Sequence, residues 1–424
     1  MEFFKKLSLF FSQYANTSEK NVGKFFARLN EGANRHKIHQ YIINYLQEDI
    51  ISFTVFTEYK YKGYNYLKSK KKRLNLYENA LAIVDDFNNF EFSYDASNLA
   101  NEIAGLAVKN NFSDSQIERL IYLRKIMAYF SPERGVYNYK HSSTFGELLK
   151  DPAKFMLVGD CNQIVSLYLY LYSLRYCIDD LKLISPPNHV AIYYLGIQIE
   201  ATMGRFTSPD PDGDILPIQE IATINILDVT DSYFKTHKIE PKSMLDASRL
   251  AFLVSSNREI VKKNLDTAYL NIIIDNINKN NYPLAINFAK QSKKINLIEY
   301  VAHKATIYFD KKHNFKEARK YASYSIDKKE LLKQIVRSEA NYLYKNTKYS
   351  GAIKLYNSLG DVAMVQNCYL ALYAFEQKKL GKIISVDDIK RQSATINSMY
   401  NYAKKTGNKD LIKYSTDLKK YLKK

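Results

Sequence analysis

The chain has 424 residues, 46% of them apolar and 25% charged, a composition typical of a globular protein with room for roughly three domains. Its three cysteines, Cys161, Cys177 and Cys368, form no C-x-x-C pair and leave one thiol over, which argues against a disulfide framework and fits a reducing compartment. The net charge of +18 is uneven: residues 241–424 carry 35 Lys and Arg against 16 Asp and Glu, whereas residues 1–240 carry 27 against 28.

The chain begins MEFFKKLSLFFSQYANTSEK, with an apolar stretch that is short, interrupted and without a small-residue cleavage site. We therefore expect an amphipathic first helix rather than a signal peptide. No run approaches 18 apolar residues, so the sequence predicts no transmembrane segment. Together these features predict a cytoplasmic protein, with secretion by another route left open.

Residues 1–95 read as helices, for example NRHKIHQYIINYLQEDIISF, in which apolar residues recur at helical spacing. Two further helical stretches follow, DASNLANEIAGLAVKN and SDSQIERLIYLRKIMAYF, each with Asp or Ser in the capping position. Eight of the nine prolines lie between Pro132 and Pro241. Because proline stops helices and central strands, the middle of the chain is predicted to be rich in turns.

The segment VGDCNQIVSLYLYLYSL (158–174) places a cysteine where a Gly-Asp turn enters a long apolar run. Asp160 is a good helix N-cap, so Cys161 is predicted in the first turn of a mostly buried helix. Unpaired N–H groups and the helix dipole stabilise a thiolate at that position. Cys161 is therefore a candidate nucleophile, whereas Cys177 and Cys368 are interpreted as small packing residues.

The segment PPNHVAIYYLGIQIEAT (186–202) reads as a β-hairpin. If Leu195-Gly196 forms a two-residue turn, the numbers of paired residues sum to 391, and one face of the hairpin is almost entirely apolar. His189 and Glu200 then become diagonal neighbours on the other face. A carboxylate that orients an imidazole, which activates a thiol, is the arrangement of nucleophilic catalysis.

These residues resemble the transglutaminase-like superfamily of papain-type cysteine enzymes. GDC opens a helix, a histidine starts a strand and an acid followed by Thr202 lies on the next strand; IMAYFSPERGVY and TFGELLKDPAKFMLVGDC, upstream, are also similar to the family. The resemblance covers roughly residues 96–206. It implies an α+β domain in which Cys161 is the nucleophile, His189 the base and Glu200 the orienting acid, although the family usually has Asp at that last position.

The oxyanion hole is less defined by the sequence. The backbone N–H of Cys161 supplies one donor, and Tyr137 and Tyr139 are candidates for a side-chain donor. No cofactor or metal is predicted, because the chain has no Gly-rich phosphate loop. SPDPDGDILP (208–217) holds three aspartates but lacks the Gly and Glu that a calcium loop needs at its sixth and twelfth positions. His36 and His39 have no third ligand.

Near the C-terminus NYPLAINFAKQS, NFKEARKYASYS and KYSGAIKLYNSL align without gaps. Their alanines, Ala285, Ala318 and Ala352, are spaced 33 and 34 residues apart. This pattern resembles degenerate tetratricopeptide repeats, which present concave binding surfaces. The excess positive charge predicts an acidic protein or peptide partner on the repeats; nucleic acid, an anionic membrane and simple solvation of the lysines are the alternatives.

The sequence thus predicts an α+β protein in three parts: an N-terminal helical segment (1–95), a transglutaminase-like, papain-type domain (96–232) and a basic, tetratricopeptide-like helical solenoid (233–424). The predicted function is peptide hydrolysis, deamidation or acyl transfer by Cys161, His189 and Glu200, with the repeats recruiting a partner or substrate. The alternative is a non-catalytic scaffold built on an inactive form of the same fold. A nucleic-acid-associated scaffold is a third reading.

Overall fold

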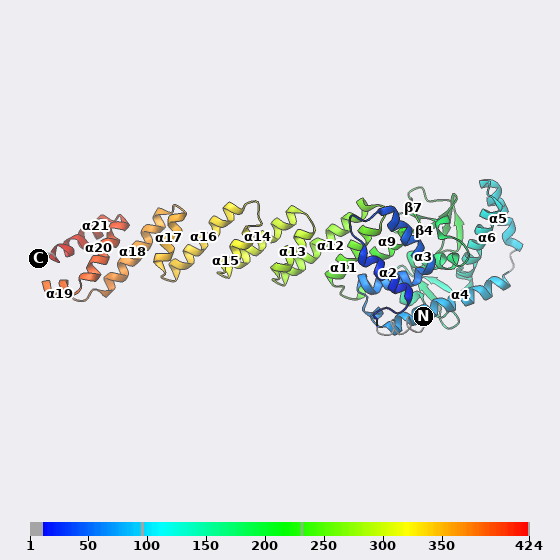
Figure 1. Cartoon of the computed structure of the whole chain (residues 1–424), viewed down its shortest axis with the longest axis horizontal. Helices are drawn as coiled ribbons and strands as arrows, with labels where there is room; N and C mark the ends of the chain where they lie inside the picture. The colour runs from blue at the N-terminus through cyan, green and yellow to red at the C-terminus, as the bar shows by residue number, and fades with distance from the viewer. Residues whose placement is uncertain (1–11, 95–96, 230–231, 423–424) are drawn as a thin grey trace. The chain divides into compact units, whose positions relative to one another are not determined.

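The computed structural model describes residues 12–94, 97–229 and 232–422 and is mixed α+β (Figure 1). The predicted first helix falls largely on residues 1–11 and lies outside the described residues. The chain divides into two compact units, Met1–Ile272 and Ile273–Lys424, with the boundary inside helix α12 (Arg258–Asn278). Among the helices that the structure describes, none is both long enough and apolar enough to cross a membrane.

The first unit opens with helices that their capping residues delimit. Asn16 accepts a hydrogen bond from the Glu19 backbone at the start of α2, and Asn34 accepts one from Lys37 at the start of α3. The helices of this unit before α12 are α2 (Thr17–Arg28), α3 (Arg35–Thr57), α4 (Lys70–Ser93), α5 (Ser97–Asn110), α6 (Asp114–Tyr129), α7 (Phe145–Leu148), α8 (Cys161–Ser173), α9 (Glu220–Leu227), α10 (Ser232–Thr236) and α11 (Pro241–Val254).

A buried ion pair joins two of these helices. The Arg73 side chain on α4 is fully buried, and its Nε lies 2.7 Å from Oε1 of Glu19 on α2. The guanidinium also donates to the carbonyls of Leu67 and Gln13, both at 2.7 Å, and the Tyr77 hydroxyl donates to Glu19. The charges are thus paired and their hydrogen bonds filled, as burial requires.

The strands form two sheets. The larger is antiparallel, in the order β6-β5-β4-β3-β7, and the smaller pairs β1 with β2 in parallel. Their bounds are β1 (Tyr137–Tyr139), β2 (Leu157–Gly159), β3 (Lys182–Ser185), β4 (Ala191–Tyr194), β5 (Ile197–Glu200), β6 (Arg205–Thr207) and β7 (Asp214–Pro217). Short irregular helical turns occupy Glu58–Lys62, Asn65–Leu67, Pro132–Arg134 and Ile178–Asp180.

One hydrophobic core runs through the first unit. It combines Leu46 of α3, Leu167 of α8 and Ile192 of β4, and it includes Leu250 and Val254 of α11. Helices from residues 1–95, the middle segment and the first helix after Pro241 therefore bury their apolar faces together. The compact units differ in this respect from the three parts expected from the sequence, because apolar contacts cross both expected boundaries.

The second unit repeats one backbone pattern. Asn280, His313 and Thr347 have positive φ angles of 56°, 57° and 60°, and each lies in the short connection between two helices. The three alanines singled out in the sequence are all fully buried. From α13 to α18 each helix packs on the next along the chain, and α18 then packs on α20. The bounds are α13 (Tyr282–Gln291), α14 (Ile295–Lys311), α15 (Phe315–Ala322), α16 (Lys328–Lys345), α17 (Tyr349–Ser358), α18 (Val362–Lys379), α19 (Val386–Arg391), α20 (Ser393–Thr406) and α21 (Lys409–Tyr421).

Candidate active site

Cys161 is the first residue of α8, as predicted. The Asp160 side chain accepts a hydrogen bond from the backbone of Gln163, and the Gln163 side chain accepts one from the backbone of Asp160, which makes a capping box. The other residues of α8 are almost all buried, so the helix is anchored along its length. Cys161 itself is only partly buried, which leaves its thiol at an accessible end of a rigid helix.

The predicted hairpin register is confirmed. Tyr194 pairs with Ile197 and Ile192 with Ile199, so the paired numbers sum to 391. Leu195 and Gly196 have φ angles of 45° and 89°, the left-handed pair that a tight two-residue turn requires. The predicted apolar face, formed by Val190, Ile192, Tyr194, Ile197, Ile199 and Ala201, is buried in the core.

The hairpin brings His189 and Glu200 into direct contact. His189 Nε2 lies 3.0 Å from Oε1 and 2.9 Å from Oε2 of the carboxylate. The Thr202 hydroxyl donates to Glu200 Oε1 at 2.7 Å, which helps to fix the carboxylate. Before the strand, Asn188 has a φ of 60° and the His189 backbone N–H donates to the carbonyl of Pro186. This tight turn fixes the position of the His189 backbone.

The charges of this group are coupled. The close interaction with the Cys161 side chain, followed by the hydrogen bonds with Glu200, raises the pKa of His189 to about 10 in spite of burial. Burial raises the pKa of Glu200, but the hydrogen bonds from His189 and Thr202 together lower that pKa by more. The net pKa of Glu200 is therefore below its usual value. At neutral pH His189 is therefore a charged imidazolium held against the Glu200 carboxylate.

A cleft of about 760 Å³ opens over Cys161 and His189. Its apolar part is formed by Val190, Leu216, Ile224, Leu227, Ile260 and Val261. Four carboxylic acids, Asp160, Asp214, Glu220 and Asp228, also line it, and none of the described lining residues is Lys or Arg. Apart from its histidines the cleft therefore presents apolar, neutral polar and acidic side chains.

The two tyrosine candidates for the oxyanion hole are placed differently. Tyr137 is buried and its hydroxyl donates to the carbonyl of Gly159 at 2.9 Å, so it is engaged in holding β1 to β2. Tyr139 is 43% exposed and lines the cleft with Cys161. Because Tyr139 pairs with Gly159, two residues before Cys161, strand pairing sets its position beside the thiol.

A polar network next to Cys161 was not found by sequence reasoning. The Asn162 amide donates to Asn225 on α9 at 2.9 Å, and the Asn225 amide donates to Ser166 at 3.0 Å. Asn162 also reaches a carboxylate oxygen of Asp228 at 3.4 Å. The only signal in the sequence was the asparagine that follows the cysteine; its partners lie about sixty residues away and depend on how α8 packs against α9.

The remaining sequence candidates contribute no site. Cys368 is buried, as expected, but Cys177 is exposed, so its interpretation as a packing residue was wrong: it follows the end of α8 and lies at the surface. In the described parts of the chain, no three His, Cys, Asp or Glu side chains are grouped to hold a metal ion. Within the Asp-rich loop, Asp210 accepts a hydrogen bond from the Asp212 backbone, a local turn contact.

The chain was compared with protein-family models, curated proteins and solved structures, and no match was found in any of the three. Its function is therefore argued from the site alone.

Proposed function

We propose that the protein carries out cysteine-dependent amide chemistry, with Cys161 as nucleophile, His189 as its proton-transfer partner and Glu200 as the acid that orients His189. The observation that supports this most strongly is that Cys161 and His189 line the same cleft, with His189 Nε2 held 2.9 Å from the Glu200 carboxylate. The proposal includes a transglutaminase-like architecture for the cysteine helix and the antiparallel sheet.

The raised pKa of His189 changes the role that the sequence assigned to it. With a pKa of about 10, His189 holds its proton at neutral pH, and a positive charge of this kind is what a cysteine nucleophile requires beside it. The thiolate attacks the carbonyl carbon of the amide, and the C–N bond breaks as His189 gives its proton to the leaving amine. The product is a thioester on Cys161. Water or a second amine then attacks the thioester, His189 takes back a proton, and the thiolate leaves.

Two donors are proposed for the oxygen that carries negative charge during these steps. One is the backbone N–H of Cys161, at the N-terminus of α8, and the other is the hydroxyl of Tyr139. The carboxylates in the cleft disfavour an acidic substrate segment, so we propose a substrate that is neutral or cationic around the reacting amide. The basic helical repeats are proposed to recruit the protein that carries it.

The test is acyl transfer from an activated ester, which requires no knowledge of the natural substrate. The protein is incubated with p-nitrophenyl acetate and digested, and acetylation is followed by mass spectrometry at each cysteine. We expect rapid acetylation of Cys161 but not of the exposed Cys177, loss of that adduct in Cys161→Ser, and slower acetylation in Tyr139→Phe, by roughly tenfold or more. Acetylation of Cys161 no faster than that of Cys177 would contradict the proposal.

The same protein is then offered dimethylated casein with a dansylated amine. Transfer of the amine, release of ammonia without transfer, or cleavage of the chain would identify acyl transfer, deamidation or hydrolysis respectively. A Cys161→Ser control is required in each case. If Cys161 forms the acetyl adduct but no amide reacts, the thiol is reactive and the assignment to amide chemistry fails.

A further inference from the structure

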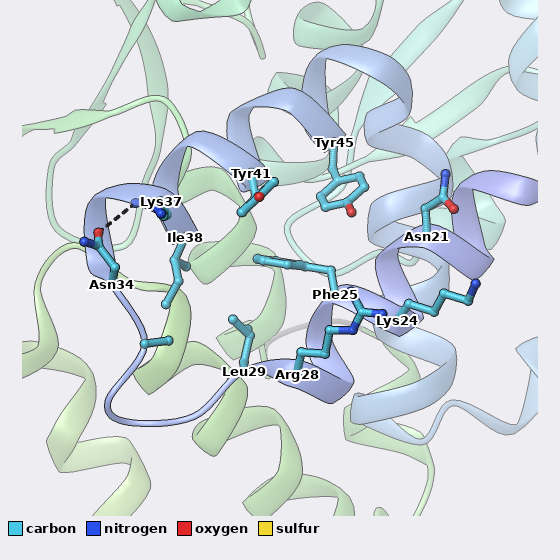
Figure 2. Close-up of a pocket in the computed structure, with 11 residues that line it drawn as sticks. Asn21, Lys24, Phe25, Arg28, Leu29, Asn34, Lys37, Ile38, Tyr41 and Tyr45 are labelled. Carbon is cyan, nitrogen blue, oxygen red and sulfur yellow. Dashed lines mark hydrogen bonds between the residues drawn. The ribbon is translucent and has the colours of Figure 1, made fainter.

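A second concave surface lies between α2 and α3, away from the chemistry proposed for Cys161 (Figure 2). We call it the α2–α3 groove; its volume is about 550 Å³. The two helices pack side by side, and a short connection that includes Ala33 and Asn34 closes one end. Asn21 lies at the opposite end (Figure 2).

The floor of the groove is apolar and aromatic. The Phe25 ring lies between α2 and α3, with ring centroids 5.3 Å from Tyr45 and 5.7 Å from Tyr41. Leu29 and Ile38 lie together beyond Phe25, toward the connection between the helices (Figure 2). The Tyr41 side chain is 52% exposed, so this aromatic surface is only partly covered by the chain itself. A single apolar side chain of a ligand fits such a floor.

The rim of the groove is cationic. Lys24, Arg28 and Lys37 line it, and none of its described lining residues is Asp or Glu. None of these three cations has an ion-pair partner among the residues that the structure describes, whereas Lys125, for example, pairs with Glu91 at 3.0 Å. An unpaired set of cations over an apolar floor is complementary to a negatively charged ligand that also has an apolar part.

Helix electrostatics explains one of these cations and not the others. Arg28 lies in the last turn of α2, where a positive charge is stabilising. Lys37 lies in the first turn of α3, which contains no acidic residue, so its charge adds to the positive end of the helix dipole. That placement costs folding stability slightly and strengthens the positive field over the groove, which an anionic ligand would offset.

We propose that the α2–α3 groove binds an acidic segment of a protein partner, with one apolar side chain of that segment on Phe25 and Leu29 and its carboxylates against Lys24, Arg28 and Lys37. We choose an acidic peptide over a nucleic acid because Leu29 and Ile38 add an aliphatic end to the aromatic floor, which suits an apolar side chain, whereas a base would use only the ring faces. The chain's own residues 1–11 carry two lysines and one glutamate, so they lack the charge that the groove selects.

Because the chain contains no tryptophan, the fluorescence of a tryptophan in a ligand reports binding directly. The probe is a synthetic peptide with one tryptophan flanked on both sides by glutamates, titrated with the full-length protein while its own emission is followed. We expect saturable binding that weakens as salt rises. The double variant Lys24→Ala, Arg28→Ala should bind roughly tenfold more weakly, at about threefold for each exposed charge pair.

A matched control removes the same charge elsewhere in the same unit. Lys71 and Lys72 are exposed on α4 and lie outside the groove, so Lys71→Ala, Lys72→Ala should bind the peptide as the wild type does. An unlabelled competitor with phenylalanine in place of tryptophan should displace the probe, and one with serine should not. Circular dichroism is used to check that each variant is folded.

The proposal is overturned if the peptide does not bind, if the two double variants bind it equally, or if the serine competitor displaces it as well as the phenylalanine one. It is also overturned if a single-stranded oligonucleotide or vesicles of phosphatidylserine bind more tightly than the peptide and lose affinity in Lys24→Ala, Arg28→Ala. None of these readouts uses the thiol of Cys161, so they do not depend on the proposed chemistry.

Discussion

The contacts inside the first compact unit differ in sequence range from the contacts inside the second. In the first unit the decisive contacts join residues far apart in sequence, such as Glu19 with Arg73 and Asn162 with Asn225. In the second unit the helices from α13 to α18 each pack on the next along the chain, around buried alanines that recur at nearly equal spacing. Long-range contacts can hold a thiol, an imidazole and a carboxylate in one geometry, whereas a repeat of local contacts builds an extended surface that tolerates variation.

The largest loss of stability is expected in the first unit, when one partner of its buried ion pair is removed. Arg73→Leu leaves the Glu19 carboxylate buried without its cation, so we expect the free energy of unfolding of this unit to fall by about 3–5 kcal/mol. Urea denaturation followed by circular dichroism and by the exposure of Cys161 measures the change.

The matched control is Arg391→Leu in the second unit. Arg391 is largely exposed and its ion pair with Asp388 is long, at 4.0 Å. Its replacement should therefore change the free energy of unfolding by less than about 0.5 kcal/mol. Equal effects of the two substitutions would show that burial of the Glu19–Arg73 pair does not govern the stability of the first unit.

A smaller effect is expected from overpacking one repeat. Ala318 on α15 is fully buried between helices, so Ala318→Leu should destabilise the second unit by about 1–3 kcal/mol. The same change at Ala374, which is exposed on α18, should be nearly neutral. Hydrogen exchange read along the chain should show faster exchange in α14–α16 and unchanged exchange around Cys161. Loss of protection throughout the first unit would mean that the two units do not behave independently.

The smallest effect is on the pH dependence of stability. His189 has a pKa of about 10 in the folded protein against an ordinary value of 6.5, so its contribution is complete below pH 6.5 and is lost as pH rises through 10. We expect this loss to be on the order of 1–2 kcal/mol once solvent screening is allowed for. His189→Asn should show a smaller decline in unfolding free energy between pH 7 and pH 10 than the wild type. Parallel declines would contradict the raised pKa.

Local patterns in the sequence predicted both the repeats and the hairpin. The helix pairs follow from the spacing of Ala285, Ala318 and Ala352, and the register of β4 and β5 follows from the Leu195-Gly196 turn and strict alternation along the strands. Each of these signals is contained within a few dozen residues, where geometry leaves few choices.

Features that depend on packing at long range could not be predicted in the same way. Tyr137 and Tyr139 are equivalent in the sequence, and only the pairing of β1 with β2 places one hydroxyl on Gly159 and the other side chain in the cleft. The Asn162–Asn225 contact likewise depends on how α8 packs against α9. The positions of these residues therefore depend on packing within the first unit.

The most direct test of the proposed site compares two cysteines in one molecule. Cys161 is partly buried and Cys177 is exposed, but only Cys161 lines the same cleft as His189. Iodoacetamide labelling at pH 7, quantified at each cysteine by mass spectrometry, should modify Cys161 at least about tenfold faster than Cys177. His189→Ala should remove that difference. Equal rates at the two cysteines in the wild type, or an unchanged ratio in His189→Ala, would contradict the proposed pairing of Cys161 with His189.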